Sequence, residues 1–178
     1  MEVCEGEKMD FFVIEVNENY TAPSLVGWYG IIDKKTLSRK KVYQLPKHLL
    51  FTVEKHMQMV FTDVITVPCF MVSEMVRDII KRYDPSVWFL RIILYDKECK
   101  RSMAYFIPYL KQIKYKEQID AEIRSLHHLS VQKEDIEEKV IVEIENGFNF
   151  KVIMRMDLVE SILRREAVGI GLRKIDIL

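Results

Sequence analysis

The sequence predicts an α+β fold in which a mostly antiparallel sheet carries two main amphipathic helices. Three features support this prediction: runs of β-branched and aromatic residues, two stretches with apolar residues at helical spacing, and an Asn-Gly pair between strand-like runs. The chain has 178 residues, of which 49% are hydrophobic. At this length we expect one domain over residues 1–178, with an N-terminal segment at 1–60 and a strand–helix–strand core at 61–178.

Strands and loops dominate the predicted N-terminal part. Residues 10–16 (DFFVIEV) are rich in strand-forming residues, whereas residues 17–30 contain Asn, Pro and Gly in the manner of a loop. Residues 31–51 are mixed in character and predict only short strands. Residues 61–67 predict a further strand, which ends at Pro68.

The first helix is predicted at residues 74–83. Ser73 precedes it, and a serine hydroxyl in this position accepts a hydrogen bond from a free backbone N–H of the first turn. Cationic residues in the last turn suit the helix dipole, and Pro85 ends the helix. The apolar residues that share one face are Met75, Val76, Ile79, Ile80 and Tyr83.

Three further strands are predicted after this helix. Residues 87–95 (VWFLRIILY) are apolar at almost every position, which predicts a central strand covered on both faces, with an antiparallel partner at 102–109. The pair Asn146-Gly147 predicts a hairpin over 144–156, because both residues tolerate the positive φ of a type I′ turn. Alternation of residue types places one face of this hairpin on the core, with Ile153 as the exception.

The second helix is predicted at residues 158–166, with Asp157 as its cap and a closing strand at 171–178. Five of its residues match residues of the first helix at a constant offset of 83, as from Val76 to Val159. Any amphipathic helix on a sheet shows such a pattern. The alternative is a chain built from two pseudo-repeated lobes.

The two strand–helix–strand blocks resemble a known family. The first block is the segment PCFMVS at 68–73 with its helix, the YDP stop at 83–85 and the strand at 87–95. The second block is Met156-Asp157 with its helix, the AVGI segment at 167–170 and the final strand. Together they resemble small bacterial immunity-like domains, which are encoded beside polymorphic or contact-dependent toxins. The resemblance implies an α+β protein that binds and blocks a toxin, and it carries over no catalytic or binding residue.

Charge and cysteine content narrow the function classes. Lysine plus arginine number 27 and aspartate plus glutamate number 27, so the zero net charge argues against a general binder of nucleic acid or anionic membranes. The three cysteines form no CxxC pair and the acidic N-terminus lacks the features of a signal peptide, so we expect a cytoplasmic protein. The longest apolar runs are too short to span a bilayer, and we expect no membrane partner.

The residue types of metal and enzyme sites occur without the spacing that their chemistry requires. His127 and His128 are adjacent, so on an extended strand their side chains would point to opposite faces and would not share one ion. Cys69 lies in an apolar run and Cys99 in a charged turn, and neither has a recognisable histidine partner. The six glycines form no nucleotide-binding pattern. We therefore expect no catalytic site, no metal and no cofactor.

Two groups of residues are predicted to bind a partner. Tyr20, Trp28 and Tyr29 lie in the loop at 17–30, and these residue types dominate interface hot spots; alternatively, the loop packs on the core as a lid. The second group is acidic and would steer a basic partner such as a nuclease. A basic cluster at 34–47 carries the opposite charge. Alternatively, both clusters are ordinary solvated turns. The acidic group comprises Glu134, Asp135, Glu137 and Glu138.

These observations favour a non-enzymatic immunity protein that neutralises a cognate bacterial toxin by direct contact. Such a protein needs a rigid scaffold and a complementary face, which buries roughly 1,200–2,000 Å² in all. It would occlude the active site of the toxin or the path of its substrate. Two alternatives remain open from the sequence: a small enzyme whose active site is dispersed along the chain, and a regulatory adaptor or homodimeric structural protein.

Overall fold

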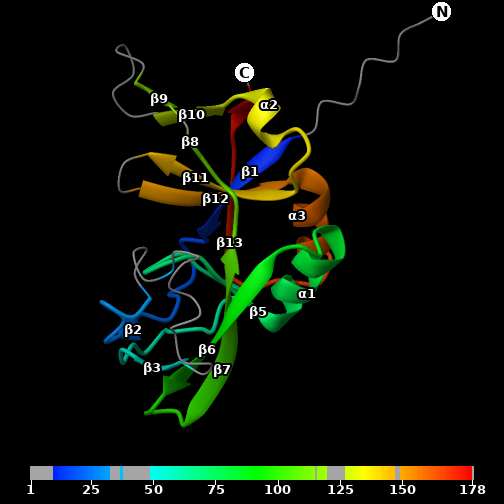
Figure 1. Ribbon diagram of the computed structural model, residues 1–178. Helices are drawn as coiled ribbons and strands as arrows, with labels where there is room; N and C mark the ends of the chain where they lie inside the picture. Colours follow the sequence, from blue (N-terminus) through cyan, green and yellow to red (C-terminus); the bar gives the residue numbers. More distant parts are fainter. Residues whose placement is uncertain are drawn as a thin grey trace, which may run out of the picture.

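The computed structural model describes residues 10–32, 37, 49–114, 116–119, 127–146 and 149–177, and over this part of the chain the fold is α+β with mostly antiparallel sheets (Figure 1). The predicted fold class is therefore confirmed. Two large sheets dominate the molecule, however, whereas the sequence predicts one sheet with two main helices. The helices are α1 (Glu74–Tyr83), the short α2 (Lys133–Ile136) and α3 (Met156–Leu163).

The first large sheet has five strands in the order β13-β1-β12-β11-β8. Its neighbours are antiparallel, apart from the parallel pair of β8 and β11. A small sheet, in the order β14-β10-β9, packs with α2 on the same side of the molecule, and we call this assembly the five-stranded lobe (Figure 1). The bounds are Phe11–Val16 (β1), Gln112–Lys114 (β8), Lys116–Ile119 (β9), His127–Val131 (β10), Ile141–Asn146 (β11), Asn149–Arg155 (β12), Ile170–Lys174 (β13) and Asp176–Ile177 (β14).

The second large sheet has six strands in the order β2-β3-β6-β7-β5-β4, and we call it the six-stranded lobe. Only β3 and β6 are parallel neighbours in it. The long strand β6 lies between β3 and β7, so its predicted central position is correct. The bounds are Leu25–Val26 (β2), Leu49–Val53 (β3), Val64–Ile65 (β4), Met71–Ser73 (β5), Trp88–Asp96 (β6) and Arg101–Tyr109 (β7).

Two strands of the six-stranded lobe differ from their predictions. Along β6, burial alternates: Leu90 and Ile92 on one face are buried, whereas Arg91 on the other face is exposed. The sequence predicts that both faces of this strand are buried, and the structure buries only one of them completely. The strand predicted at 61–67 shrinks to β4, because the backbone N–H of Asp63 donates to Val168 O at 2.8 Å and is not available for a strand ladder.

Each lobe contains the same split strand–helix–strand unit. In the six-stranded lobe, β5 leads directly into α1 and the chain returns as β6, with the antiparallel strand β7 between β5 and β6. In the five-stranded lobe, β12 leads into α3 and the chain returns as β13, with the antiparallel strand β1 between them. In the six-stranded lobe the intervening strand, β7, follows β6 in a hairpin. In the five-stranded lobe the intervening strand, β1, comes from the N-terminal part of the chain. The two blocks therefore share one topology, as pseudo-repeated lobes would.

One hydrophobic core belongs to both lobes. It joins side chains of β5, α1 and β7 to side chains of β12 and α3, and the two helices pack against each other beside it (Figure 1). Each large sheet has a further core on its other face. In β12, Val152 and Met154 therefore face the shared core while Ile153 faces the second one. The predicted hairpin of β11 and β12 is present, but both of its faces are buried where the alternation predicts one; Gly147 lies outside the described residues.

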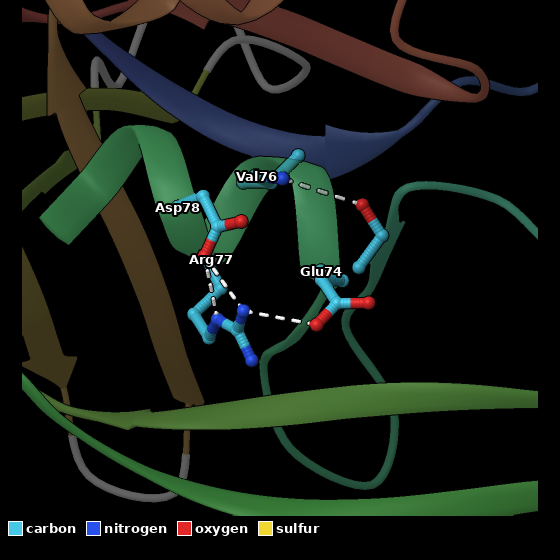
Figure 2. Close-up of polar contacts among 5 residues, drawn as sticks. Glu74, Val76, Arg77 and Asp78 are labelled. Carbon is cyan, nitrogen blue, oxygen red and sulfur yellow. Dashed lines mark hydrogen bonds and ion pairs between the residues drawn. The ribbon is translucent and has the colours of Figure 1, made fainter. Parts of the chain in front are cut away.

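Helix α1 begins and ends as predicted. The Ser73 hydroxyl accepts a hydrogen bond from the backbone N–H of Val76 at 3.4 Å, which confirms the predicted cap. One turn further along the helix, the Arg77 guanidinium donates to the Glu74 carboxylate at 3.0 Å, as Figure 2 shows. The Cζ atom of Arg77 lies 4.0 Å from the centre of the Phe106 ring. A cation over an aromatic face is attractive, so Arg77 fastens the exposed side of α1 to β7.

Helix α3 begins earlier than predicted, and Arg155, not Asp157, occupies the cap position. Asp157 is a first-turn residue whose carboxylate accepts two hydrogen bonds from the Arg155 guanidinium, at 2.9 and 2.8 Å. These bonds hold the pKa of the Asp157 carboxyl below its usual value. The helix ends at Leu163, short of its predicted end, and the chain reaches a left-handed conformation at Glu166 (φ 57°).

Candidate functional site

The aromatic loop, residues 17–30, is fixed to the six-stranded lobe at its C-terminal end. The backbone N–H groups of Ile31 and Ile32 both donate to the carbonyl of Trp28, at 3.1 Å. The Ile32 side chain is fully buried in the core behind β6. The tip of the loop is therefore held by a short turn and an apolar anchor, and it has a defined shape.

The three predicted binding residues of this loop differ in exposure. Trp28 is half-buried and packs on the core, so the lid interpretation describes this residue. Tyr29 is 84% exposed, and its ring meets that of Trp28 edge to face with 5.9 Å between centroids. Tyr20 is 40% exposed. The loop thus presents Tyr29 to solvent on a half-buried tryptophan.

A second loop, residues 54–60, lies beside the aromatic loop. Thr21 and Met59 form a β-bridge, and the backbone N–H of Val60 donates to Thr21 O at 3.0 Å. Met57, at the turn of this loop, is 98% exposed. The two loops, with Ile31 just after the first, expose large apolar side chains, which we call the apolar surface: Tyr20, Val26, Tyr29, Ile31, Met57 and Val60.

The acidic cluster lies on α2 and the turn that follows it. Glu134, Asp135, Glu137 and Glu138 are all exposed, as a steering surface and a solvated turn both require. Lys133 pairs with Glu137 at 3.5 Å, which offsets one of the four charges.

The two predicted binding groups lie far apart. Helix α2 lies at the end of the five-stranded lobe. The short strand β2, which is part of the aromatic loop, lies in the six-stranded lobe at the other end of the molecule (Figure 1). The structure therefore does not bring the acidic cluster and the aromatic loop into one contact surface. The basic cluster predicted at 34–47 falls outside the described residues apart from Leu37.

The histidines and cysteines are dispersed. His127 and His128 lie on β10, and His56 lies in the loop at 54–60. Cys69 is half-buried in the segment that joins β4 to β5, and Cys99 is exposed in the turn between β6 and β7. Within the described ranges, no three His, Cys, Asp or Glu residues come together in a way that could hold a metal ion.

The structure also has a crevice between the lobes, which the sequence does not predict. Two adjoining cavities, of about 460 and 470 Å³, share Cys69, Phe70, Glu143 and Val152 as walls. A third cavity of about 210 Å³ shares residues 66–68 with the second and reaches Trp28. The three cavities follow the segment between β4 and β5, so they form one elongated crevice that leads toward the aromatic loop.

Tyr109 lines the far end of this crevice. Its hydroxyl is buried, and among the described residues it has no hydrogen-bond partner. Burial raises the pKa of Tyr109 to about 12, and the negative charge of a nearby Cys69 thiolate would add to this effect. At neutral pH the phenol is therefore protonated and can donate a hydrogen bond, for which the described residues supply no acceptor.

The carboxylates of the crevice, in contrast, have partners. The side-chain amide of Gln112 donates to Glu143 at 2.7 Å, and the Arg173 guanidinium donates to Glu15 at 2.8 Å. Two lysines, Lys111 and Lys151, also line the crevice, so its walls carry charges of both signs.

A scan against models of known protein families finds no match to this chain, and a search of curated protein sequences likewise finds none. In the part of the chain that the structure describes, no helix is long and apolar enough to cross a membrane.

Proposed function

We propose that this protein is a non-enzymatic immunity protein that neutralises a bacterial toxin by direct contact, with the aromatic loop at the centre of that contact. The observation that carries the proposal is the 84% exposure of Tyr29, seated edge to face on the half-buried Trp28. A side chain that is 84% exposed removes little apolar area from water, so it contributes little to folding. Tyrosine and tryptophan at a fixed, protruding position are typical of the residues that dominate binding energy at interfaces.

The two loops that meet at Thr21 and Met59 have the composition of an interface. They expose the large side chains of the apolar surface together with the charged and polar residues Glu18, Asn19, Glu54 and Lys55. Protein interfaces combine such an apolar centre with a polar rim. Because the aromatic loop is anchored by hydrogen bonds to Trp28, its ordering would cost little free energy on binding.

The groups of the crevice support binding more than catalysis. A general base works best when its pKa lies near the operating pH. The pKa of Tyr109 is raised to about 12, so its phenol would be a poor base at neutral pH. Tyr109 is therefore a weak candidate for the general base of a dispersed active site.

The proposal predicts that a toxin is encoded beside this gene, and it is tested by identifying that neighbouring reading frame and co-expressing its product with this chain. We expect growth to be restored and a complex to persist at micromolar concentration. The reason is that a surface of this kind, buried over roughly 1,200–2,000 Å², supports stable association. Unrestored growth together with the absence of a complex would refute the proposal.

Tyr29→Ala is expected to weaken toxin binding by about 30-fold or more, which corresponds to a hot-spot loss of about 2 kcal/mol. Isothermal titration calorimetry with the purified toxin measures the affinity. Leu163→Ala is the matched control: Leu163 is 44% exposed at the end of α3, outside the apolar surface, and we expect a change within about twofold. Because Tyr29 is so exposed, its variant should melt at the wild-type temperature, and equal affinities of the two variants would argue against the loop.

Reversing the acidic cluster to lysine distinguishes the two predicted binding groups. If the toxin docks on the aromatic loop, the acidic cluster lies at the other end of the molecule (Figure 1). At physiological salt, exposed charges separated by more than about 8 Å are largely screened from each other. We then expect the association rate to change by no more than about threefold at 0.15 M salt in stopped-flow measurements. A fall of tenfold or more would move the contact to α2.

A further inference from the structure

We infer that two copies of this chain associate through β13, so that their five-stranded sheets join edge to edge around a two-fold axis at Leu172. The inference goes beyond the proposed function and does not depend on it, because the partner is a second copy of this chain and not the toxin. It is carried by the open edge of β13, by the pairing of its charges and by the match of this edge to itself.

The backbone hydrogen bonds of β13 alternate between its two sides. At the two ends of the strand, the backbone N–H of Asn17 donates to Gly169 O at 2.9 Å, and that of Ile175 donates to Phe11 O at 3.2 Å. An antiparallel ladder repeats every second residue, so the odd-numbered residues of β13 bond to β1. The even-numbered residues direct their backbone groups away from β1, and these residues are Ile170, Leu172 and Lys174.

The outer side of β13 is open over one short stretch. Strand β13 ends the order of the five-stranded sheet, and no strand of the described part of the chain pairs with its outer side. At the preceding outward position, both backbone groups of Val168 are bonded to Asp63. After Lys174 the chain passes to the small sheet, where β14 pairs with β10. The open stretch is therefore Ile170–Lys174, and Leu172 lies at its centre.

The charged side chains of β13 do not guard this edge. Lysines and other charges on an edge strand commonly keep it from pairing with further chains. In β13, however, the Arg173 guanidinium donates to Glu15 at 2.8 Å and the Lys174 ammonium donates to Asp10 at 2.7 Å, so both cations are paired within their own sheet. Leu172, between Arg173 and the open backbone groups on either side, is 39% exposed. The edge is thus apolar at its centre, and its cations are neutralised.

A second copy of β13 matches this edge when the two strands run antiparallel with Leu172 opposite Leu172. Each outward residue then lies opposite an outward residue, so each can donate one backbone hydrogen bond and accept another. The two leucine side chains lie on the same face and contact each other. Lys174 lies opposite Ile170 of the second copy, and Arg173 lies opposite Gly171, so no like charges face each other.

The two ends of this pairing are complementary in charge. The Asp63 carboxylate accepts from the backbone N–H of Val168 at 2.6 Å, at the outward position that precedes Ile170. In the two-fold pairing, Lys174 of one copy is the diagonal neighbour of this position in the other copy, where an ammonium and a carboxylate attract each other. Two-fold symmetry repeats this contact at the other end. The chain therefore supplies from its own sequence the apolar centre, the cation and the spacing that the edge requires.

Sedimentation equilibrium of the full chain, without any toxin, tests the inference. The chain has a mass of 21.2 kDa. We expect about twice this mass at roughly 100 μM and the monomer mass below about 1 μM, because one strand pair with a few apolar contacts lies at the small end of specific interfaces. The monomer mass at every concentration up to about 1 mM would overturn the inference.

Leu172→Lys is expected to raise the dissociation constant of the dimer by about tenfold or more, since it removes the apolar contact at the axis and places two ammonium groups opposite each other. The matched control is Leu50→Lys. Leu50 is 65% exposed on β3 of the six-stranded sheet, and we expect its variant to change the constant by no more than about twofold. Equal dissociation constants for the two variants would overturn the inference.

A cross-link at the axis tests the same pairing without weakening it. The background replaces the three natural cysteines with serine, and they are Cys4, Cys69 and Cys99. In the two-fold pairing, Leu172→Cys places each thiol opposite its own copy with Cα atoms about 5.5 Å apart, which a disulfide spans. We expect mild oxidation to convert most of Leu172→Cys to a covalent dimer and to leave Leu50→Cys mostly monomeric. Equal yields of covalent dimer would overturn the inference.

These outcomes are distinguishable from failure of the proposed function, because no toxin is present in the three measurements. A dimer that forms as expected while the toxin is not neutralised would leave the inference intact and refute the proposed function. A chain that stays monomeric, and whose binding to the toxin is weakened by Leu172→Lys, would show that the open edge accepts a strand of the toxin. That result would overturn self-association through β13.

Discussion

Gly169→Ala is expected to lower the free energy of unfolding by about 4 kcal/mol, a large fraction of the total for a natural domain. Gly169 follows α3 in the turn to β13 and adopts a φ of 76°, where an alanine costs about 1–2 kcal/mol. A Cβ atom at this position would also overlap Cγ2 of Thr62 and lie 2.7 Å from its Cβ. Overpacking of this kind costs about 1–3 kcal/mol more.

Thr62 cannot move aside cheaply. Its side chain is fully buried, and its hydroxyl donates to the carbonyl of Val64 at 2.7 Å. Its own carbonyl accepts from the buried hydroxyl of Tyr105 at 2.6 Å. A shift of Thr62 would therefore break hydrogen bonds inside the six-stranded lobe, and the strain would be shared between the lobes.

Gly30→Ala is the matched control. Gly30 has the same φ of 76°, but a Cβ there would meet no atom within 4 Å, so we expect a loss of about 1 kcal/mol. Urea denaturation gives both free energies. We further expect Thr62→Ser to recover part of the loss in Gly169→Ala, because it removes the overlapping methyl group. Equal losses in the two glycine variants would show that the contact with Thr62 relaxes freely.

The elements predicted correctly are those whose signals are local in the sequence. Helix α1 has its cap, its apolar face and its proline stop within a dozen residues, and it begins and ends as predicted. The β11–β12 hairpin likewise depends on a turn between adjacent strands. Short-range hydrogen bonds and sterics decide such elements, so tertiary contacts do not change them.

The errors occur where distant segments meet. Asp63 bonds to Val168, which lies more than a hundred residues away, and this contact shortens the strand predicted around it. The division into two sheets depends on β1, an N-terminal strand that completes a C-terminal unit. Pairings of this kind have no local sequence signal, and the apolar pattern alone is compatible with one sheet.

The candidate site likewise has a part that the sequence predicts and a part that it does not. Tyr20, Trp28 and Tyr29 are recognisable by residue type in a punctuated loop, although the sequence does not indicate that Trp28 is half-buried and Tyr29 almost fully exposed. The crevice has no sequence signal, because Cys69, Tyr109 and Glu143 come from three separate segments. Only the packing of the two lobes brings them to one cavity.

Asp63→Ala is expected to lower the free energy of unfolding by about 3 kcal/mol. The Asp63 carboxylate accepts from the Ser73 hydroxyl and, at 2.6 Å, from the backbone N–H of Val168. Hydrogen bonds to a charged group contribute about 1.5–3 kcal/mol each, and the lower value applies to a half-buried carboxylate. Ser73 is also the cap of α1, so Asp63 connects the start of that helix with the turn that follows α3.

The control for this prediction is Asp84→Ala. Asp84 also accepts two hydrogen bonds, from the backbone N–H and the hydroxyl of Ser86, but both are exposed and join residues two apart. We expect a loss of about 1 kcal/mol, since a local turn at the surface re-forms its hydrogen bonds with water. The difference between the two aspartates therefore measures the contribution of the connection between the lobes.

The number of steps in the unfolding curve reports whether Asp63 couples the two lobes. Because the shared core takes side chains from both lobes, we expect the wild type to unfold in one transition, detected at the same urea concentration by tryptophan fluorescence and circular dichroism. Asp63→Ala should move this transition to lower urea without splitting it. A curve that separates into two steps, or a loss equal to that of Asp84→Ala, would mean that the lobes fold as independent units and that Asp63 does not couple them.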